Sequence, residues 1–167
     1  IALANGRGGY FTYLRDTVAR VEIVPGDARL ALEQEVQRSD TLPLDVLVVD
    51  AFSGDSIPVH LLTREAWAIY LRRLQPSGVL ALHISNRYLD LWPVSARLAK
   101  EFGLGAVLIA VKSDPENFRH ATYWVLASRD REFMAQPAIA NAASRGRARL
   151  PAAAWTDQFS DLLKVLN

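Results

Sequence analysis

Apolar residues gather in short runs along the chain, and segments with helical spacing of apolar positions separate them. The clearest run covers residues 44–50 (LDVLVVD), which is mostly aliphatic and stops at the carboxylate of Asp50. A run of this kind is typical of a buried parallel strand, and open α/β sheets bind ligands at the carboxyl ends of such strands. We therefore expect Asp50 at the mouth of a binding site, with a second acid, Asp55, in the loop that follows.

Predicted strands and helices alternate along the rest of the chain. Further strands are predicted for residues 18–24, 79–84, 106–111 and 122–127. Helices are predicted for residues 28–36, 61–74 and 93–102, and a last amphipathic helix is expected after an N-cap at Thr156 or Asp157. Alternation of this kind predicts an α/β fold with a largely parallel sheet and helices on both faces.

The composition fits one ordinary domain over residues 1–167, because half of the residues are hydrophobic and 22% are charged. The formal net charge of +1 provides no overall field that would attract nucleic acid. The chain has no cysteine, which excludes disulfides, and its three histidines lack the spacing of metal ligands. It contains no apolar run of about 18 residues, the length of a membrane span, so as written it is expected to be cytoplasmic.

Three stretches of the chain together resemble one protein family. They are Gly26-Asp27-Ala28-Arg29, residues 45–58 and the run LQPSGVL at residues 74–80. Their order and spacing resemble the spermidine synthase family of aminopropyltransferases, and the resemblance covers nearly the whole chain from about Tyr10. The stretches DAFSGDSIPVHLLT, HATYWVLAS and WTDQFSDLL are similar to a bacterial branch in which such a domain follows a membrane-spanning region. The resemblance implies a Rossmann-like methyltransferase fold and, if the native chain is longer, a cytoplasmic domain with a membrane region upstream.

The resemblance also implies roles for individual residues. Asp27 matches the acid that contacts the adenine amino group of the nucleoside cosubstrate, and Ala28 lines the same pocket. Asp50 matches the strand-end acid that holds the attacking amine and helps to deprotonate it. An acid suits this task because a polyamine is cationic at neutral pH and must lose a proton before it attacks carbon. The implied reaction moves an aminopropyl group from decarboxylated S-adenosylmethionine to a polyamine such as putrescine, with no tightly bound cofactor and no metal.

Several of the candidate residues also have a structural interpretation. Asp27 can be only the N-cap of the helix that follows it. Ser53 and Asp55 can form a solvated loop, or a mobile lid over the substrate amine. His83, at the end of a predicted strand, can face the substrate or have a purely structural role. Asp157 can cap the last helix, or reach over the cleft toward the substrate.

Two departures from the family pattern affect what the resemblance implies. The family usually follows its strand-end acid with Ser/Thr-Ser/Thr-Asp-Pro, whereas here Ala51, Phe52 and Ser53 follow and the second acid is Asp55. The Gly-rich turn after the first strand and the acid that ends the second strand would precede Ile1. We therefore expect an N-terminally incomplete domain that lacks its first two strands. It is either inactive, or completed by another chain or by a rearranged sheet. Unpaired strand edges favour a homodimer.

Two other functions are compatible with the same pattern. A methyltransferase that uses S-adenosylmethionine itself has the same fold, and differs in accepting the carboxylate of the cosubstrate. A non-catalytic domain that binds a nucleoside, or regulates a membrane region, would bind its ligand without turnover.

Overall fold

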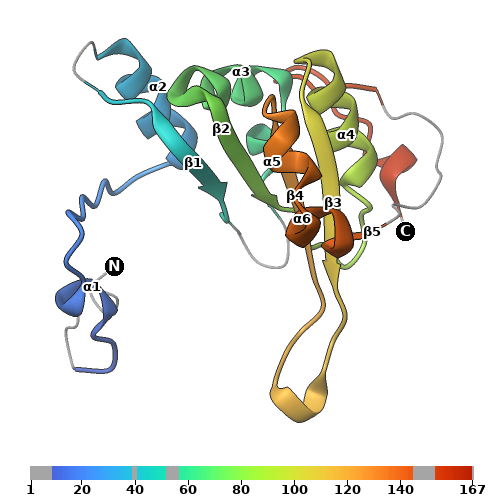
Figure 1. Cartoon of the computed structure of the whole chain (residues 1–167). Helices are drawn as coiled ribbons and strands as arrows, with labels where there is room; N and C mark the ends of the chain where they lie inside the picture. The colour runs from blue at the N-terminus through green and yellow to red at the C-terminus, as the bar shows by residue number, and fades with distance from the viewer. Residues whose placement is uncertain (1–8, 39–40, 52–56, 145–152, 167) are drawn as a thin grey trace.

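Five strands form one sheet in the computed structural model, which describes residues 9–38, 41–51, 57–144 and 153–166 (Figure 1). The strands are β1 (Leu44–Val49), β2 (Leu74–His83), β3 (Gly105–Val111), β4 (Thr122–Ser128) and β5 (Ala143–Ser144). Their order across the sheet is β1-β2-β4-β3-β5, and β1 pairs with β2 in parallel while the other three pairings are antiparallel. The α/β class is confirmed, but the sheet is mostly antiparallel and not largely parallel as predicted.

The position of β4 explains this difference. β3 and β4 are joined by residues 112–121, and a short connection brings the chain back beside the strand that it has just left. β4 lies between β2 and β3 and runs opposite to both of them. Figure 1 shows the β3–β4 hairpin extending beyond the rest of the sheet.

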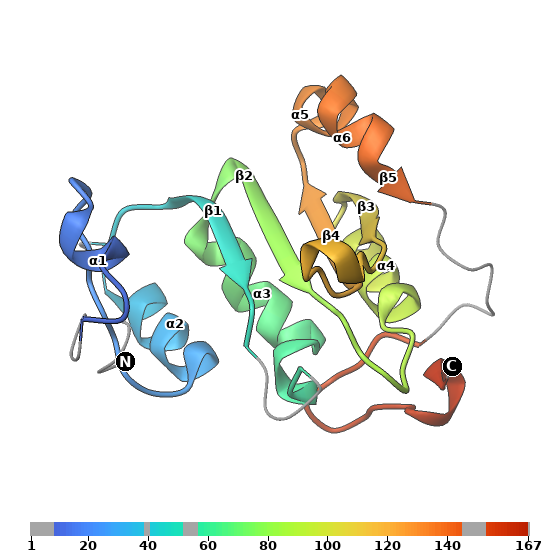
Figure 2. The ribbon, with the colours of Figure 1, turned by 90° about the horizontal axis from the view of Figure 1, so that it is seen from below.

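Helices cover both faces of the sheet. The helices of the described residues are α1 (Tyr13–Asp16), α2 (Ala28–Gln37), α3 (Arg64–Arg73), α4 (Trp92–Glu101), α5 (Arg131–Ala135) and α6 (Pro137–Ala142), with 3₁₀ turns η1 (Val59–Leu61), η2 (Pro115–Asn117) and η3 (Leu163–Val165). Figure 1 shows α1 apart from the sheet. Figure 2 shows α3 and α4 on one face, and α5 and α6 on the other. Among the described residues, no helix is long and apolar enough to cross a membrane.

The hydrophobic core lies where α3 and α4 pack against the sheet. Trp67 and Tyr70 of α3, Leu80 and Leu82 of β2, and Leu98 of α4 are fully buried in it. Trp155 of the C-terminal segment is only 1% exposed, and belongs to the same cluster. The C-terminal segment is therefore held to the fold by its own core residue.

The strand predicted for residues 18–24 is not formed. This segment has no regular structure, and its apolar side chains Val18, Val21, Ile23 and Val24 are exposed. A strand needs a neighbour because its backbone N–H and C=O groups bond sideways and not within the strand. No strand lies beside this segment among the described residues, so the apolar pattern has nothing to pair with.

The amphipathic helix predicted for the C-terminal segment is also not formed. Within residues 153–166 the helical structure is limited to the three-residue turn η3. The carbonyl of Trp155 accepts a hydrogen bond from the amide of Arg64 at 2.8 Å, and the carbonyl of Val165 accepts one from the amide of Asp90 at 2.7 Å. The carbonyl of Phe159 accepts from the amide of Thr156 at 2.8 Å, so it is not available for a helical bond to the amide four residues later.

Candidate active site

The candidate site lies at the carboxyl ends of the parallel strands β1 and β2. Figure 2 shows both arrows pointing to the end of the fold where α2 and α3 begin and where the C-terminal segment passes. Two groups of side chains gather there. We call Asp50 and His83 the strand-end pair, and we call the second group the helix-start cluster: it consists of Asp27, Arg29, His60, Thr63 and Asp157.

The strand-end pair joins the residue after β1 to the last residue of β2. Asp50 Oδ1 lies 2.7 Å from His83 Nδ1, and the side chains of Asp50 and His83 are 51% and 17% exposed. The imidazole stacks on Trp124 of β4, with ring centroids 4.5 Å apart and planes 7° from parallel. Its other nitrogen, Nε2, lies 2.7 Å from Ser85 Oγ. The arrangement holds a half-exposed carboxylate at a strand end, where it can attract a cation or accept a proton.

Asp27 opens the helix-start cluster at the N-terminus of α2. Its Oδ1 accepts a hydrogen bond from the amide of Leu30 at 3.0 Å, and its Oδ2 lies 3.0 Å from His60 Nε2. The Leu30 amide, together with His60, holds the pKa of the Asp27 carboxyl below its ordinary value. Ala28 is the first residue of α2. Asp27 is thus a helix cap, and its second oxygen lies beside the ring of His60.

Arg29 and Asp157 form the central ion pair of the helix-start cluster. Two guanidinium nitrogens of Arg29 donate to the two carboxylate oxygens of Asp157, at 2.7 and 2.6 Å. The hydroxyl of Thr63 donates to Asp157 Oδ1 at 2.8 Å, and the carbonyl of His60 accepts from Arg29 at 3.0 Å. Arg29, helped by Thr63, lowers the pKa of Asp157 to about 2, and Asp157 raises the pKa of Arg29. This pair ties α2 to the C-terminal segment.

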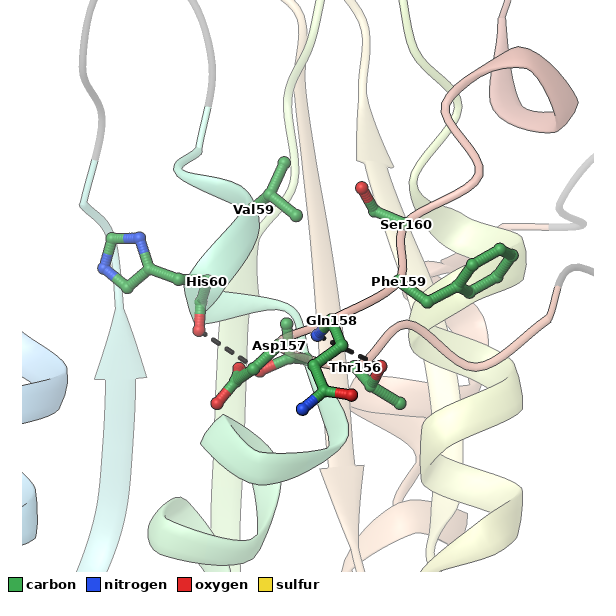
Figure 3. A pocket seen from close by; sticks show the side chains of 8 residues that line it. Val59, His60, Thr156, Asp157, Gln158, Phe159 and Ser160 are labelled. Carbon is green, nitrogen blue, oxygen red and sulfur yellow. Dashed lines mark hydrogen bonds between the residues drawn. The ribbon is translucent and has the colours of Figure 1, made fainter.

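A pocket of about 370 Å³ opens beside the helix-start cluster (Figure 3). Its lining combines η1 and the start of α3 with the C-terminal segment: Val59, His60, Thr63, Thr156, Asp157, Gln158, Phe159 and Ser160. Thr156 and Phe159 exchange two backbone hydrogen bonds, which fold this part of the segment into a tight turn. The volume suits a small ligand or one part of a larger ligand.

The structure brings the predicted site residues together in two places. Asp50 meets His83, and Asp27 shares one cluster with Asp157, whose side chain is engaged with Arg29 and Thr63. Their substrate roles stay predictions. Ser53 and Asp55 lie outside the described residues. Among the described residues, no three His, Asp or Glu side chains gather in a way that could hold a metal ion.

Sequence reasoning missed three members of the helix-start cluster. Arg29 lies inside the Gly26-Asp27-Ala28-Arg29 stretch, but no local pattern indicates that its partner lies 128 residues later. His60 lies in η1, and Thr63 directly precedes α3 and caps it by accepting from the amide of Ala66. The cap of α3 was the one available signal, because Thr in front of a helical apolar pattern is a common N-cap.

No protein-family model matches the chain, and no curated protein sequence does. A probable spermidine synthase from Corynebacterium glutamicum is 23% identical, with 75% of this chain and 43% of that one covered and a TM-score of 0.49. MNMC2 from Aquifex aeolicus is 17% identical to this chain. The match covers 71% of this chain and 35% of that one, with a TM-score of 0.43. Spermidine synthase from Thermotoga maritima is 14% identical to this chain. The match covers 92% of this chain and 50% of that one, with a TM-score of 0.51.

The similarity to the Thermotoga protein shows that this chain has a spermidine-synthase-like fold. This confirms the fold that the sequence resemblance implied. The chain spans half or less of the length of each of the three solved structures. At these identities the similarity concerns the fold, so activity has to be argued from the site residues.

Proposed function

We propose that this chain forms part of an aminopropyltransferase of the spermidine synthase type. It would transfer the aminopropyl group of decarboxylated S-adenosylmethionine to a polyamine such as putrescine. The observation that carries the proposal is the half-exposed carboxylate of Asp50 at the carboxyl end of β1, held through one oxygen by His83. Ligands of open α/β sheets bind at this end of the strands.

Asp50 suits the chemistry of amine alkylation. The attacking amine arrives as an ammonium ion, which a carboxylate attracts, and it must lose a proton before its lone pair can attack. A new N–C bond then forms at the methylene next to the sulfonium, the C–S bond breaks, and the electron pair of that bond stays on sulfur as a thioether. The released proton goes to Asp50. The protein mainly supplies alignment and a local negative charge.

Asp27 is the proposed partner of the adenine amino group. Its Oδ2 lies 3.0 Å from His60 Nε2, and its side chain is partly exposed. A carboxylate oxygen accepts hydrogen bonds, and an exocyclic amino group donates them. Ala28 follows it at the first position of α2, where a small side chain leaves room for a ring. The nucleoside would then lie at the N-terminus of α2 and the amine at the end of β1.

Calorimetric titration tests the proposal with this chain and with any longer protein that contains it. Binding of decarboxylated S-adenosylmethionine in preference to S-adenosylmethionine is expected, followed by formation of spermidine when putrescine is added. Preference for S-adenosylmethionine would instead indicate a methyltransferase. Binding without turnover would indicate a non-catalytic nucleoside-binding domain, and no binding to either protein would contradict the proposal.

A matched pair of variants separates nucleoside contact from helix capping. Asp27→Ala removes the cap of α2 and the proposed adenine contact. Asp130→Ala removes a similar cap from α5, where Asp130 accepts from the amide of Phe133 at 2.9 Å. Each loss of a cap is expected to cost about 1 kcal/mol of stability. Only Asp27→Ala is expected to weaken nucleoside binding, and equal effects of the two variants on binding would contradict the role of Asp27.

A further inference from the structure

We infer that His83 is a positioning residue for Asp50: it donates from Nδ1 to Asp50 Oδ1 in one fixed tautomer and leaves Oδ2 to the substrate amine. The effect of His83 on catalysis rests on the proposed function, whereas the tautomer of its ring does not. The inference follows from the partners of the two ring nitrogens, from the stacking of the ring and from the surroundings of the carboxylate.

Hydrogen-bonding capacity determines the tautomer. The backbone amide of Tyr123 can only donate, and it lies 2.9 Å from Ser85 Oγ, so that oxygen accepts its proton. Ser85 then has its own hydroxyl proton to give, and His83 Nε2 lies 2.7 Å away. With Nε2 accepting, the proton of the neutral ring is on Nδ1, which faces the acceptor Asp50 Oδ1 at 2.7 Å. Each donor in this chain of bonds meets an acceptor.

The ring plane is set by the sheet. His83 and Trp124 lie directly opposite each other in the antiparallel pairing of β2 and β4, and side chains at such positions share one face of the sheet. Their rings stack almost in parallel, and the His83 side chain is 17% exposed. A stacked ring bonded at both nitrogens keeps its orientation. Asp50 is therefore held by a partner that is itself rigid.

One oxygen of Asp50 is thereby left for the substrate. Within the described part of the chain, Asp50 Oδ2 accepts no hydrogen bond, and the side chain is half exposed. A proton that Oδ2 takes from the amine cannot pass to His83 Nδ1, because that nitrogen already carries one. His83 therefore orients the carboxylate and does not relay its proton.

Nitrogen-15 NMR of the imidazole rings tests the tautomer directly on the wild-type chain. The proton is expected on Nδ1 of His83, with His120 in the same spectrum as the reference ring. Asp50→Ala removes the acceptor and Ser85→Ala removes the donor to Nε2, so each variant is expected to increase the population with the proton on Nε2. A wild-type ring protonated on Nε2, or a tautomer that neither variant changes, would overturn the inference.

Two substitutions of His83 test the catalytic consequence. The side-chain amide of Asn reaches about the place of Nδ1, whereas that of Gln reaches about the place of Nε2. His83→Gln is expected to lower kcat by on the order of 10²-fold with an unchanged KM for the nucleoside, because the carboxylate loses its orienting donor. His83→Asn is expected to keep most of the wild-type kcat, because its amide can still donate to Asp50. His120→Gln is the control for a His-to-Gln substitution, and should leave kcat unchanged.

The outcomes keep the inference separate from the proposed function. Equal losses in His83→Asn and His83→Gln would show that the ring acts only through packing, and would overturn the positioning role. If the wild-type protein has no transferase activity, the proposed function fails. The NMR measurement then decides by itself whether His83 holds Asp50 in the inferred tautomer.

Discussion

The strand-end pair and the helix-start cluster lie at the same end of the fold, and each places an acid beside a basic side chain. In the helix-start cluster, Asp157 receives two bonds from a guanidinium that is 13% exposed and a third from Thr63. In the strand-end pair, Asp50 has one partner for one oxygen, and half of its side-chain surface is open. Both oxygens of Asp157 accept hydrogen bonds from the protein, whereas only one oxygen of Asp50 is bonded to a described residue.

The different bonding of Asp157 and Asp50 suits them to different roles, the first to stabilising the fold and the second to binding a substrate. A carboxylate that is fully bonded within the protein stabilises the folded state, and it would lose those bonds if it turned to a substrate. A carboxylate held through one oxygen keeps its orientation and retains an acceptor for an incoming group. We therefore expect changes in the pair of Arg29 and Asp157 to appear mainly in the free energy of unfolding, and changes in the strand-end pair to appear in turnover.

Asp50→Asn is expected to have the largest effect on activity. The amide keeps the shape of the side chain but cannot take a proton, so turnover should fall by about 10²- to 10⁴-fold. Nucleoside affinity, measured by calorimetry, should stay unchanged. Asp45→Asn is the matched control, because Asp45 lies at the other end of β1 and accepts a hydrogen bond from Gln75. An equal loss of turnover in Asp50→Asn and Asp45→Asn would contradict a specific role of the Asp50 carboxylate in turnover.

Trp155→Ala is expected to have the largest effect on stability. The side chain is fully buried and anchors the segment that carries Asp157, so its removal should lower the free energy of unfolding by about 3–5 kcal/mol. Urea denaturation followed by circular dichroism measures the change. Leu163→Ala, at an exposed position of the same segment, should cost about 0.5 kcal/mol or less. Similar costs would mean that the segment is not part of the core.

Arg29→Met is expected to lower the free energy of unfolding by about 1–2 kcal/mol, because it removes both bonds to Asp157. The value is moderate because Asp157 is 40% exposed and water partly replaces its partner. Arg15→Met removes the exposed pair of Arg15 with Asp16, and should leave the free energy of unfolding nearly unchanged. The two variants are compared by urea denaturation. A larger cost for Arg15→Met would contradict a structural role of the helix-start cluster.

The pH dependence of the helix-start cluster should be the smallest measurable effect. The folded pKa of Asp157 is about 2, below the ordinary value of 3.8, so the charged form is favoured by folding. Its stabilising contribution is complete above 3.8, decreases as the pH falls, and is lost below about 2. The difference in unfolding free energy between the wild type and Asp157→Asn should therefore be constant at neutral pH and shrink only in acid. If the difference in unfolding free energy already disappears near neutral pH, it does not come from the ionised carboxylate of Asp157.

Local patterns predicted most of the elements near the site. Residues 44–50 were expected to form a strand that ends at Asp50, and β1 covers Leu44–Val49. A helix cap is one of the two roles predicted for Asp27, and it is confirmed, because Asp27 accepts from the amide of Leu30. The helix start depends on neighbouring residues, and the strand forms because β2 pairs with it. The predicted burial of this strand is wrong: β1 is an edge strand, and Val46 and Val48 are exposed. The strand predicted for residues 18–24 failed because a strand also depends on a partner elsewhere.

By itself, the sequence determined the α/β class, the strand that ends at Asp50 and the cap at Asp27, since these follow from apolar spacing and local hydrogen bonds. The tertiary structure alone decided what surrounds the two acids. Trp124 meets His83 because β4 inserts between β2 and β3, and Arg29 meets Asp157 across 128 residues because the C-terminal segment is anchored beside α3. Contacts of this kind come from the packing of whole elements, which no local pattern of residues records.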